Sequence, residues 1–523
     1  MHKKKYNFKG GIDYSSLKKE QSNETVKNFL SFPKKFIIFI KHSLLQKNQL
    51  RVRINQKVLR GQPLSFGSET IVPVHSPASG YIKNISFFSF SENKSNEYIK
   101  IVIISDGEDK WIKLHPIKNY KKHTPEKLIR IIHKSGIIGL GGGKFPSSQK
   151  LKLSINKVHT LVINAVESEP FVTSDDCLFN NYLNEILVGC KIISWISKIK
   201  LVLIVVQENK TEIISKISSL IHNQLLFKLC LISNKYPGGS SKILIKALTD
   251  KEIPYKKHAI DIGFLVFNVA TVYSIKRAVF NGEPLTERIV TFLGDKNFFH
   301  GNFWVKIGTP ISYFLMHFKI QAYSDINIYL GGMLMGNKVF DLNNSTLQGQ
   351  NCIFITSNKL INKKYTEYAC IRCGFCSKAC PINLLPQQLY WYIQSKEHDQ
   401  TNKHHILDCI ECKVCEQLCP SNIPLVKYFK YEKKIQHNIN IENNRRNLSL
   451  VRFEKKQKRL FFNKKIFSKD DLFLKSNPIL RINDFNSKKI EKTLNSFEIE
   501  ENKKNKRKEI IQQAINRMKL KNK

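Results

Sequence analysis

The chain has 523 residues, 42% of them hydrophobic, and its 85 lysines and arginines outnumber 42 aspartates and glutamates to give a formal charge of +43. This length predicts about three or four domains, and the apolar content excludes a wholly disordered chain. No apolar run approaches the roughly 18 residues of a membrane-spanning helix, and no apolar stretch of a signal peptide follows the basic opening. We therefore expect a cytoplasmic protein unless a partner holds it at a membrane.

The positive charge suggests nucleic-acid binding as one possible role. The basic residues, however, are spread along the chain and are not gathered in one motif, and the sequence is rich in Lys, Asn and Ile. We therefore expect no dedicated nucleic-acid binding. An attraction to anionic lipid headgroups is favoured, because each basic residue near such a surface contributes on the order of 1 kcal/mol.

The first informative segment is a glycine-rich loop from Gly136 to Pro146. Backbone N–H groups without a Cβ nearby can form a nest for a phosphate, and Lys144 and Lys150 add positive charge. The loop differs from the dinucleotide-binding fingerprint, because Lys144 stands at the third glycine position. By itself the pattern fits both a phosphate-binding loop and an ordinary turn.

Strand-like and helix-like segments alternate between about Lys127 and Thr291. Short apolar runs at 160–164, 201–206 and 226–232 predict strands, and Tyr182–Ile196 carries a helical stripe of apolar residues. This alternation predicts an α/β layer with a parallel sheet, whose ligands bind in the loops at the carboxyl ends of the strands.

Polar residues follow the apolar runs at 160–164 and 226–232 and a further apolar run just before Asn268. The acidic side chains after 160–164 can accept hydrogen bonds from ribose hydroxyls, or they are solvated loop carboxylates. The segments Tyr236–Ser240 and Asn268–Thr271 offer an aromatic ring and small polar groups, which suit a flat cofactor, although each is weak evidence alone. The acidic candidates are Glu167, Glu169, Asp175 and Asp176.

Eight of the 12 cysteines lie within one stretch of about 50 residues, where C-x2-C-x2-C-x3-C-P occurs twice. Three thiolates at i, i+3 and i+6 wrap three corners of one cubane, and the fourth, followed by proline, reaches the other cluster. One [4Fe–4S] cluster is therefore predicted on Cys370, Cys373, Cys376 and Cys419. The second is predicted on Cys409, Cys412, Cys415 and Cys380.

Two other interpretations of these cysteines are weaker. A disulfide framework is disfavoured where thiols stay reduced. Zinc would account for C-x2-C pairs, but it explains neither the third cysteine nor the proline in both copies. The two cluster motifs therefore predict that the chain moves electrons.

Four further cysteines, each alone in an apolar stretch, are expected to be buried small hydrophobes: Cys177, Cys190, Cys230 and Cys352.

The motifs in this order resemble the RnfC component of the Rnf (Rsx) ion-translocating oxidoreductase complex, over roughly residues 5–430. The α/β part is similar to the flavin-bearing, NADH-oxidising subunit of respiratory complex I. Phe8–Ile12 matches the family's opening. Lys57–Leu64 with Pro73–Gly80 looks like its lipoyl-like barrel-sandwich domain, which lacks a lysine for lipoyl attachment here, and Gly331–Gly336 matches its small β-grasp-like domain.

The resemblance implies a multidomain α/β and α+β protein. Its expected parts are an N-terminal barrel-sandwich domain at 1–120, an FMN/NADH-binding α/β domain at 121–295, a β-grasp-like domain at 296–357, an α-helical two-[4Fe–4S] ferredoxin-type domain at 358–430 with motifs at about 361–390 and 400–429, and a basic tail at 431–523.

The resemblance also implies FMN as a cofactor, NADH as the substrate and roles for single residues. Gly139, Gly141, Gly142 and Lys150 would surround the flavin and its phosphate, and Asn164, Asn268 and Thr271 would also hold the flavin. Glu167 and Glu169 would contact flavin or nicotinamide nucleotide, and Tyr236 would line the nucleotide site. The sequence departs from these patterns at Lys144 (usually glycine), Val166 (acidic in complex I) and Ser241 (commonly glutamate), which leaves the NADH affinity open.

Residues 431–523 hold 26 basic and 11 acidic side chains. This composition predicts a solvated tail, disordered or partly helical, or an electrostatic anchor to anionic lipid or a partner protein.

The leading hypothesis is a peripheral electron-input subunit at the cytoplasmic face of the bacterial inner membrane. It would pass electrons from NADH through FMN and two [4Fe–4S] clusters to integral membrane subunits that translocate ions. One alternative is a soluble flavin/iron–sulfur dehydrogenase or hydrogenase subunit. Another is a non-catalytic iron–sulfur relay or nucleic-acid-binding module.

Overall fold

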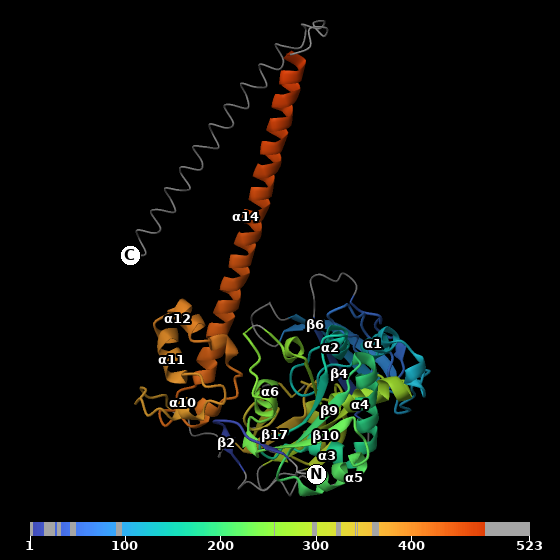
Figure 1. Ribbon diagram of the computed structural model, residues 1–523. Helices are drawn as coiled ribbons and strands as arrows, with labels where there is room; N and C mark the ends of the chain where they lie inside the picture. Colours follow the sequence, from blue (N-terminus) through green and yellow to red (C-terminus); the bar gives the residue numbers. More distant parts are fainter. Residues whose placement is uncertain are drawn as a thin grey trace. The chain divides into compact units, whose positions relative to one another are not determined.

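The computed structural model describes residues 4–14, 27–28, 33–41, 49–89, 97–255, 257–294, 301–320, 326–339, 341–342, 344–357 and 366–475, and the last described side chain is that of residue 462. The chain divides into two units, residues 1–436 and 437–523. Figure 1 shows the course of the chain, coloured from the N-terminus to the C-terminus.

The N-terminal part contains an antiparallel four-stranded sheet in the order β4 (Lys35–Lys41), β7 (Glu97–Ser105), β6 (Gly80–Ser89) and β5 (Lys57–Val58). The middles of β4 and β7 are buried on both faces: Phe36, Ile38, Ile101 and Ile103 are fully or almost fully buried, and Ile37 and Val102 between them are buried as well. The first four of these side chains share one core cluster with those of the α/β part, so the two parts pack on each other.

The α/β part is built on a five-stranded parallel sheet. Its order is β1 (Lys5–Tyr6), β10 (Phe227–Ile232), β9 (Leu201–Gln207), β8 (Thr160–Ala165) and β12 (Phe264–Asn268). The parallel sheet and the three strands predicted from apolar runs are confirmed. The central strands are apolar on both faces because helices cover them.

Seven helices accompany this sheet in the described chain, and the helix predicted at 182–196 is confirmed as α4. They are α1 (Pro125–Lys134), α2 (Ser147–Ser154), α3 (Ser174–Asn181), α4 (Leu183–Ser197), α5 (Thr211–Ile221), α6 (Ser241–Thr249) and α7 (Val269–Lys276), with short 3-10 turns η3 (Tyr120–Lys122) and η4 (Ala259–Ile262) and a π-helical turn η5 (Arg277–Asn281).

A third sheet is mixed and six-stranded. It runs β16 (Asn337–Val339), β15 (Ile326–Leu330), β17 (Cys352–Ser357), β13 (Glu287–Gly294), β14 (Gly301–Lys306) and β3 (Lys27–Asn28), and α8 (Ile311–His317) packs on it around Phe292, Phe303 and Phe314. Since β13 pairs with β14 and β17, this sheet begins before residue 296, where the sequence suggested a boundary.

The first three strands of the chain do not belong to the N-terminal sheet; they pair with strands of the other sheets. β1 extends the edge of the parallel sheet, and β2 (Ile12–Asp13) pairs with β11 (Lys235–Tyr236). β3 pairs with β14. The first residues therefore tie the α/β part and the third sheet to the start of the chain.

The cysteine-rich part is helical. It comprises α10 (Phe375–Ala379), α11 (Pro386–Gln394), α12 (His398–Lys403), the turn η7 (Ile406–Asp408), α13 (Val414–Gln417) and the start of α14 (Leu425–Lys475), and α10, α11 and α12 gather near that start (Figure 1). Buried Leu389, Ile406, Val426 and Phe429 form its core together with the cysteines.

Helix α14 continues into the second unit, so the predicted tail is helical as far as residue 475, and residues 476–523 lie outside the described part. Every side chain from Glu442 to Phe462 is exposed. In the part of the chain that the structure describes, no helix combines the length and apolar character that crossing a bilayer requires.

A buried network of charges joins the sheets. The Arg60 guanidinium lies 2.7 Å from carboxylate oxygens of both Asp109 and Glu287. Asp109 also pairs with Lys306 at 2.7 Å, and Glu287 pairs with Arg277 at 2.9 Å. Because each buried charge has an opposite partner, removing one member would leave its neighbour uncompensated.

Candidate cofactor sites

The predicted flavin residues converge at one edge of the parallel sheet. Asn164 of β8 and Asn268 of β12 are register partners at the carboxyl ends of adjacent strands. The Asn268 side chain caps α7 by accepting from the Ala270 N–H at 2.9 Å, and its Nδ2 donates to Asp175 at 2.5 Å. This edge is where α/β sheets bind ligands.

The glycine-rich loop closes over this edge. Its base is fixed by the Gly139 N–H to the Phe145 carbonyl at 2.8 Å, and the Leu140 N–H donates to the Thr271 hydroxyl at 2.8 Å. A Cβ on Gly141 would lie 2.9 Å from Asn268 Cβ, so the loop and β12 are in direct contact. Gly142 has a φ of +102° and faces open space, which suits a loop that accepts a ligand from outside.

Asn164 is oriented by backbone groups on both sides. Its Nδ2 donates to the Gly239 carbonyl at 2.8 Å, and its Oδ1 accepts from the Val166 N–H at 3.0 Å. These bonds bring the 236–240 loop to the same edge as the glycine-rich loop. Gly139, Gly141, Gly142, Asn164, Asn268 and Thr271 thus lie together as the sequence suggested.

Glu167 and Glu169 have local partners of their own. The buried Glu167 carboxylate accepts from the Ser174 hydroxyl and the Asp175 N–H, both at 2.9 Å, and so caps the start of α3. Glu169 Oε1 accepts from the N–H groups of Leu334 and Met335 at 2.9 Å each. Glu167 therefore positions α3, and Glu169 joins the α/β part to the 331–336 loop.

Lys150 and Tyr236 also point to specific neighbours. Lys150 Nζ is buried, donates to the Val266 carbonyl and lies 4.8 Å from the Phe267 ring, and its burial lowers its pKa to about 8. The Tyr236 hydroxyl donates to the Cys412 carbonyl at 2.9 Å, and burial raises its pKa. The carboxyl ends of β8 and β12, together with the glycine-rich loop, are here called the flavin edge, after the flavin residues predicted there. Tyr236 thus connects the flavin edge to the cysteine-rich part.

Lys144 adopts a backbone conformation that glycine reaches more easily than other residues do. Its φ of +47° is left-handed, which costs an L-residue roughly 1 kcal/mol. Its side chain passes Gly349, where an added Cβ would lie 2.6 Å from Lys144 Cε, and burial together with Arg288 lowers its pKa.

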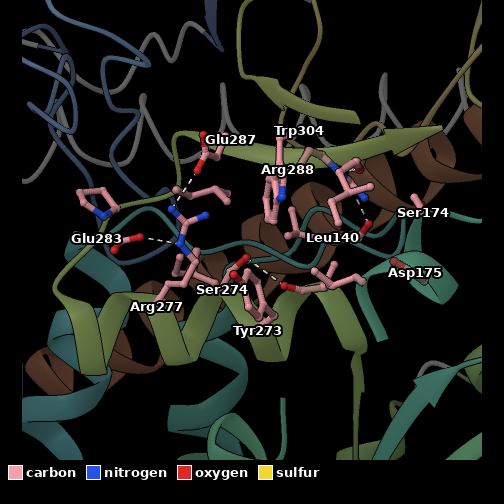
Figure 2. Close-up of a pocket in the computed structure, with 16 residues that line it drawn as sticks. Leu140, Ser174, Asp175, Tyr273, Ser274, Arg277, Glu283, Glu287, Arg288 and Trp304 are labelled. Atoms are coloured by element: carbon pink, nitrogen blue, oxygen red, sulfur yellow. Dashed lines mark hydrogen bonds and ion pairs between the residues drawn. The ribbon is translucent and has the colours of Figure 1, made fainter. Parts of the chain in front are cut away.

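A cavity of about 430 Å³ lies behind the glycine-rich loop (Figure 2). Leu140, Asp175 and Ala270 give it a wall in common with the predicted flavin edge, but Asn164, Lys150 and Tyr236 do not line it. Figure 2 shows Arg277 between Glu283 and Glu287, which neutralise it. The cavity is therefore distinct from the sheet edge at which most of the predicted flavin residues lie.

Sequence reasoning missed Arg288, which is buried in this cavity beside the loop. Its Nη1 donates to the carbonyls of Leu140 at 3.4 Å and Gln348 at 3.2 Å, and burial lowers its pKa while Asp175 and Glu167 oppose that shift. The signal that could have found it was a charged residue within the apolar strand 287–294.

The eight motif cysteines line two cavities. The first, about 400 Å³, is lined by Cys370, Cys373, Cys376 and Cys419. The second, about 340 Å³, is lined by Cys380, Cys409, Cys412 and Cys415. These are the two sets that the spacing predicts, each with its fourth cysteine from the other motif.

The donor set of each cavity fits an iron–sulfur cluster. Burial, with the neighbouring Cys409 and Cys380 thiols, raises the pKa of Cys412 to about 12, so this thiol keeps its proton at neutral pH and would release it to solvent only when a cation binds the sulfur. Cys177, Cys190, Cys230 and Cys352 are buried in the cores, as expected for small hydrophobes.

Comparisons with known proteins agree with this division. Family models described as the RnfC barrel sandwich hybrid domain, the Nuo51 FMN-binding domain and the 4Fe-4S dicluster domain match residues 6–108, 132–277 and 369–423. A curated relative from Buchnera aphidicola (Acyrthosiphon pisum), named as the C component of the ion-translocating oxidoreductase complex, is 55% identical over 89% of this chain and 98% of its own length.

The chain belongs to the RnfC family of ion-translocating oxidoreductase components. A second Buchnera relative of the same name is 46% identical over 81% of this chain and 84% of the relative, and one from Erwinia tasmaniensis is 40% identical over 87% and 56%. A solved NAD+-reducing [NiFe]-hydrogenase chain has a TM-score of 0.41 at 13% identity, over 61% of this chain and 62% of that one.

Family membership confirms the predicted fold class and cofactor classes. The barrel-sandwich, FMN-binding α/β and dicluster parts are present, and FMN and [4Fe–4S] clusters are the cofactors that these domains take. The chain is an oxidoreductase subunit.

Proposed function

We propose that this chain is the peripheral electron-input subunit of a membrane-bound, ion-translocating oxidoreductase. It oxidises NADH and passes the electrons to integral membrane subunits at the cytoplasmic face of the bacterial inner membrane. The observation that carries the proposal is the direct contact between the flavin edge and the second cysteine set, through Tyr236 and the Cys412 carbonyl.

The chain's own residues would have three roles in this reaction: they would hold FMN, hold the two clusters, and keep the two sites at a fixed separation. Asn164, Asn268 and Thr271, with Gly139, Gly141 and Gly142, would hold FMN at the sheet edge. FMN supplies the ability to take two electrons as a hydride and return them one at a time. Asn268 is kept in place by Asp175, which Glu167 positions through α3.

The cysteines would hold the two [4Fe–4S] clusters in the sets that line the two cavities. Lys242 and Asp408, paired at 2.8 Å, fix the second set against α6 of the flavin part. Two hydrogen bonds add to this ion pair: Tyr236 donates to the Cys412 carbonyl, and the Gly11 N–H donates to the Ala379 carbonyl at 2.9 Å. Together the three contacts would keep the predicted flavin edge and the second cysteine set at a constant separation.

The first test is anaerobic reconstitution, followed by counting iron, acid-labile sulfide and released FMN per chain. About eight irons and one flavin, with visible bands bleached by NADH, are expected. Eight irons without flavin would contradict the electron-input role and leave a cluster relay fed by another protein.

We also propose that the basic region beyond Tyr431 attracts the chain to anionic lipid. The exposed side chains of α14 from Glu442 to Phe462 support this proposal. The full chain should bind vesicles of phosphatidylglycerol and phosphatidylcholine, and added salt should weaken that binding. Equal binding to pure phosphatidylcholine vesicles would contradict it, and binding of DNA without lipid would favour the nucleic-acid role instead.

A further inference from the structure

The two cysteine motifs are copies, so they provide an internal comparison. Each residue of the first motif corresponds to one 39 positions later. The fourth cysteine of each motif lines the other cavity. Ile371 lines the first cavity, and Phe375 and Leu418 directly precede its cysteines Cys376 and Cys419; these three residues are here called the outer collar. Their counterparts are Ile410 and Val414, which line the second cavity, and Ala379, which directly precedes its cysteine Cys380; these are here called the inner collar.

Two of the three residues of the inner collar, Val414 and Ala379, are covered by other parts of the same chain. Val414 is 1% and Ala379 8% exposed, and both pack with Tyr236 and Leu334. Three polar contacts surround this apolar centre: Tyr236 to the Cys412 carbonyl, Lys242 to Asp408, and the Gly11 N–H to the Ala379 carbonyl. The inner collar is therefore a docking surface whose partner is part of the same chain.

Within the described residues, the outer collar is exposed. Ile371 is 67% and Phe375 52% exposed, Leu418 and the nearby Tyr368 are exposed as well, and Cys373 is an exposed cysteine. The corresponding residues Val414 and Ala379 of the inner collar are buried and have almost no contact with solvent. Grouped exposed apolar residues of this size mark an interaction site.

The charge at the outer collar differs from that at the inner one. Glu411 of the second motif corresponds to Arg372 in the first, and the acidic Asp408 corresponds to Ala369. The Arg372 guanidinium is held 4.9 Å from the Trp391 ring centroid, so it is presented in a fixed place at the rim. A partner for this surface needs an apolar centre with a carboxylate opposite Arg372.

We propose that the outer collar docks the redox subunit that receives electrons from this chain, which presents an apolar, acid-rimmed face. This rests on the proposed function. The first cysteine set, on the side of the exposed Cys373, would give up one electron for each electron that the redox centre of the partner gains, and no proton or group is transferred. The flavin-facing inner collar and the exposed outer collar thus give the relay an entry side and an exit side.

The test uses the full chain, affinity-tagged and co-expressed with the other subunits of its complex. Phe375→Glu and Tyr368→Glu should each reduce the amount of co-purified subunits by about tenfold or more, as expected for the centre of an interface. Leu225→Glu, at a fully exposed apolar residue between α5 and β10, is the matched control and should change nothing. Iron, FMN and NADH-dependent ferricyanide reduction should be the same in all variants.

The outcomes separate the docking proposal from the proposed function. Wild-type chain that brings down no other subunit would contradict the proposed function. Variants that bring down as much as wild type, with full iron content, would overturn the docking proposal. A wild-type homodimer that Phe375→Glu converts to monomers would also overturn it, because the collar would then bind a second copy.

Discussion

Replacing Gly141 by alanine is the sharpest test of the flavin edge. The new Cβ would lie 2.9 Å from Asn268 Cβ and 3.2 Å from its Cγ, whereas carbon atoms pack at about 3.5–4.0 Å. Asn268 must therefore move. It would lose its cap on α7, which contributes about 1 kcal/mol, and its bond to the Asp175 carboxylate, which contributes about 1.5–3 kcal/mol.

The summed loss of about 2.5–4 kcal/mol corresponds to roughly two to three orders of magnitude in FMN affinity when Asn268 must be in place to bind. The assay is a fluorescence titration of FMN into reconstituted protein, with a thermal unfolding curve for each variant. Gly143→Ala is the matched control, because its Cβ would meet no atom within 4 Å. Wild-type affinity in Gly141→Ala, or equal losses in both variants, would refute the reasoning.

Three other changes give distinct results. Burial lowers the pKa of Lys150 to about 8, while the unfolded chain keeps its proton to about pH 10.5, so wild type should gain up to about 3 kcal/mol relative to Lys150→Met as pH rises between these values. Thermal unfolding of both proteins along that range measures it, and a constant difference would contradict the burial of the ammonium. Lys144→Gly should relieve a left-handed backbone and raise the melting temperature or leave it unchanged, whereas a clear decrease in melting temperature would mean that the lysine side chain stabilises the loop. Cys412→Ala should lower iron from about eight to about four per chain and keep FMN, and loss of both would show that the two sites do not fold independently.

The features that the sequence predicted well are those encoded by local spacing. The cysteine motifs indicate which cysteines lie together, because three cysteines of each motif line one cavity and the fourth lines the other. The strands at 160–165, 201–207 and 227–232 were predictable because strands covered on both faces are continuously apolar. The position of the glycine-rich loop beside Asn268 followed from the family resemblance and not from periodicity.

The features that the sequence could not give depend on contacts between distant segments. Glu169 finds its partners at Leu334 and Met335, and Tyr236 finds its partner at Cys412, in each case more than 160 positions away. No local pattern encodes such pairs. Likewise, β1 and β2 pair with strands that come more than 200 residues later, at Leu231 and Tyr236, so the opening of the chain could not be placed from its own residues.

The acidic pair after β8 shows how a motif residue can serve a cofactor site through its neighbours. Glu167 holds the start of α3, α3 carries Asp175, Asp175 accepts from Asn268, and Asn268 lies against Gly141. Every link is buried or half-buried and is a hydrogen bond or a van der Waals contact, so a displacement at one end reaches the glycine-rich loop. The carboxylate of Glu167 therefore matters to the flavin edge because it fixes the end of this series of contacts, and Glu169 does the same for the loop at 331–336.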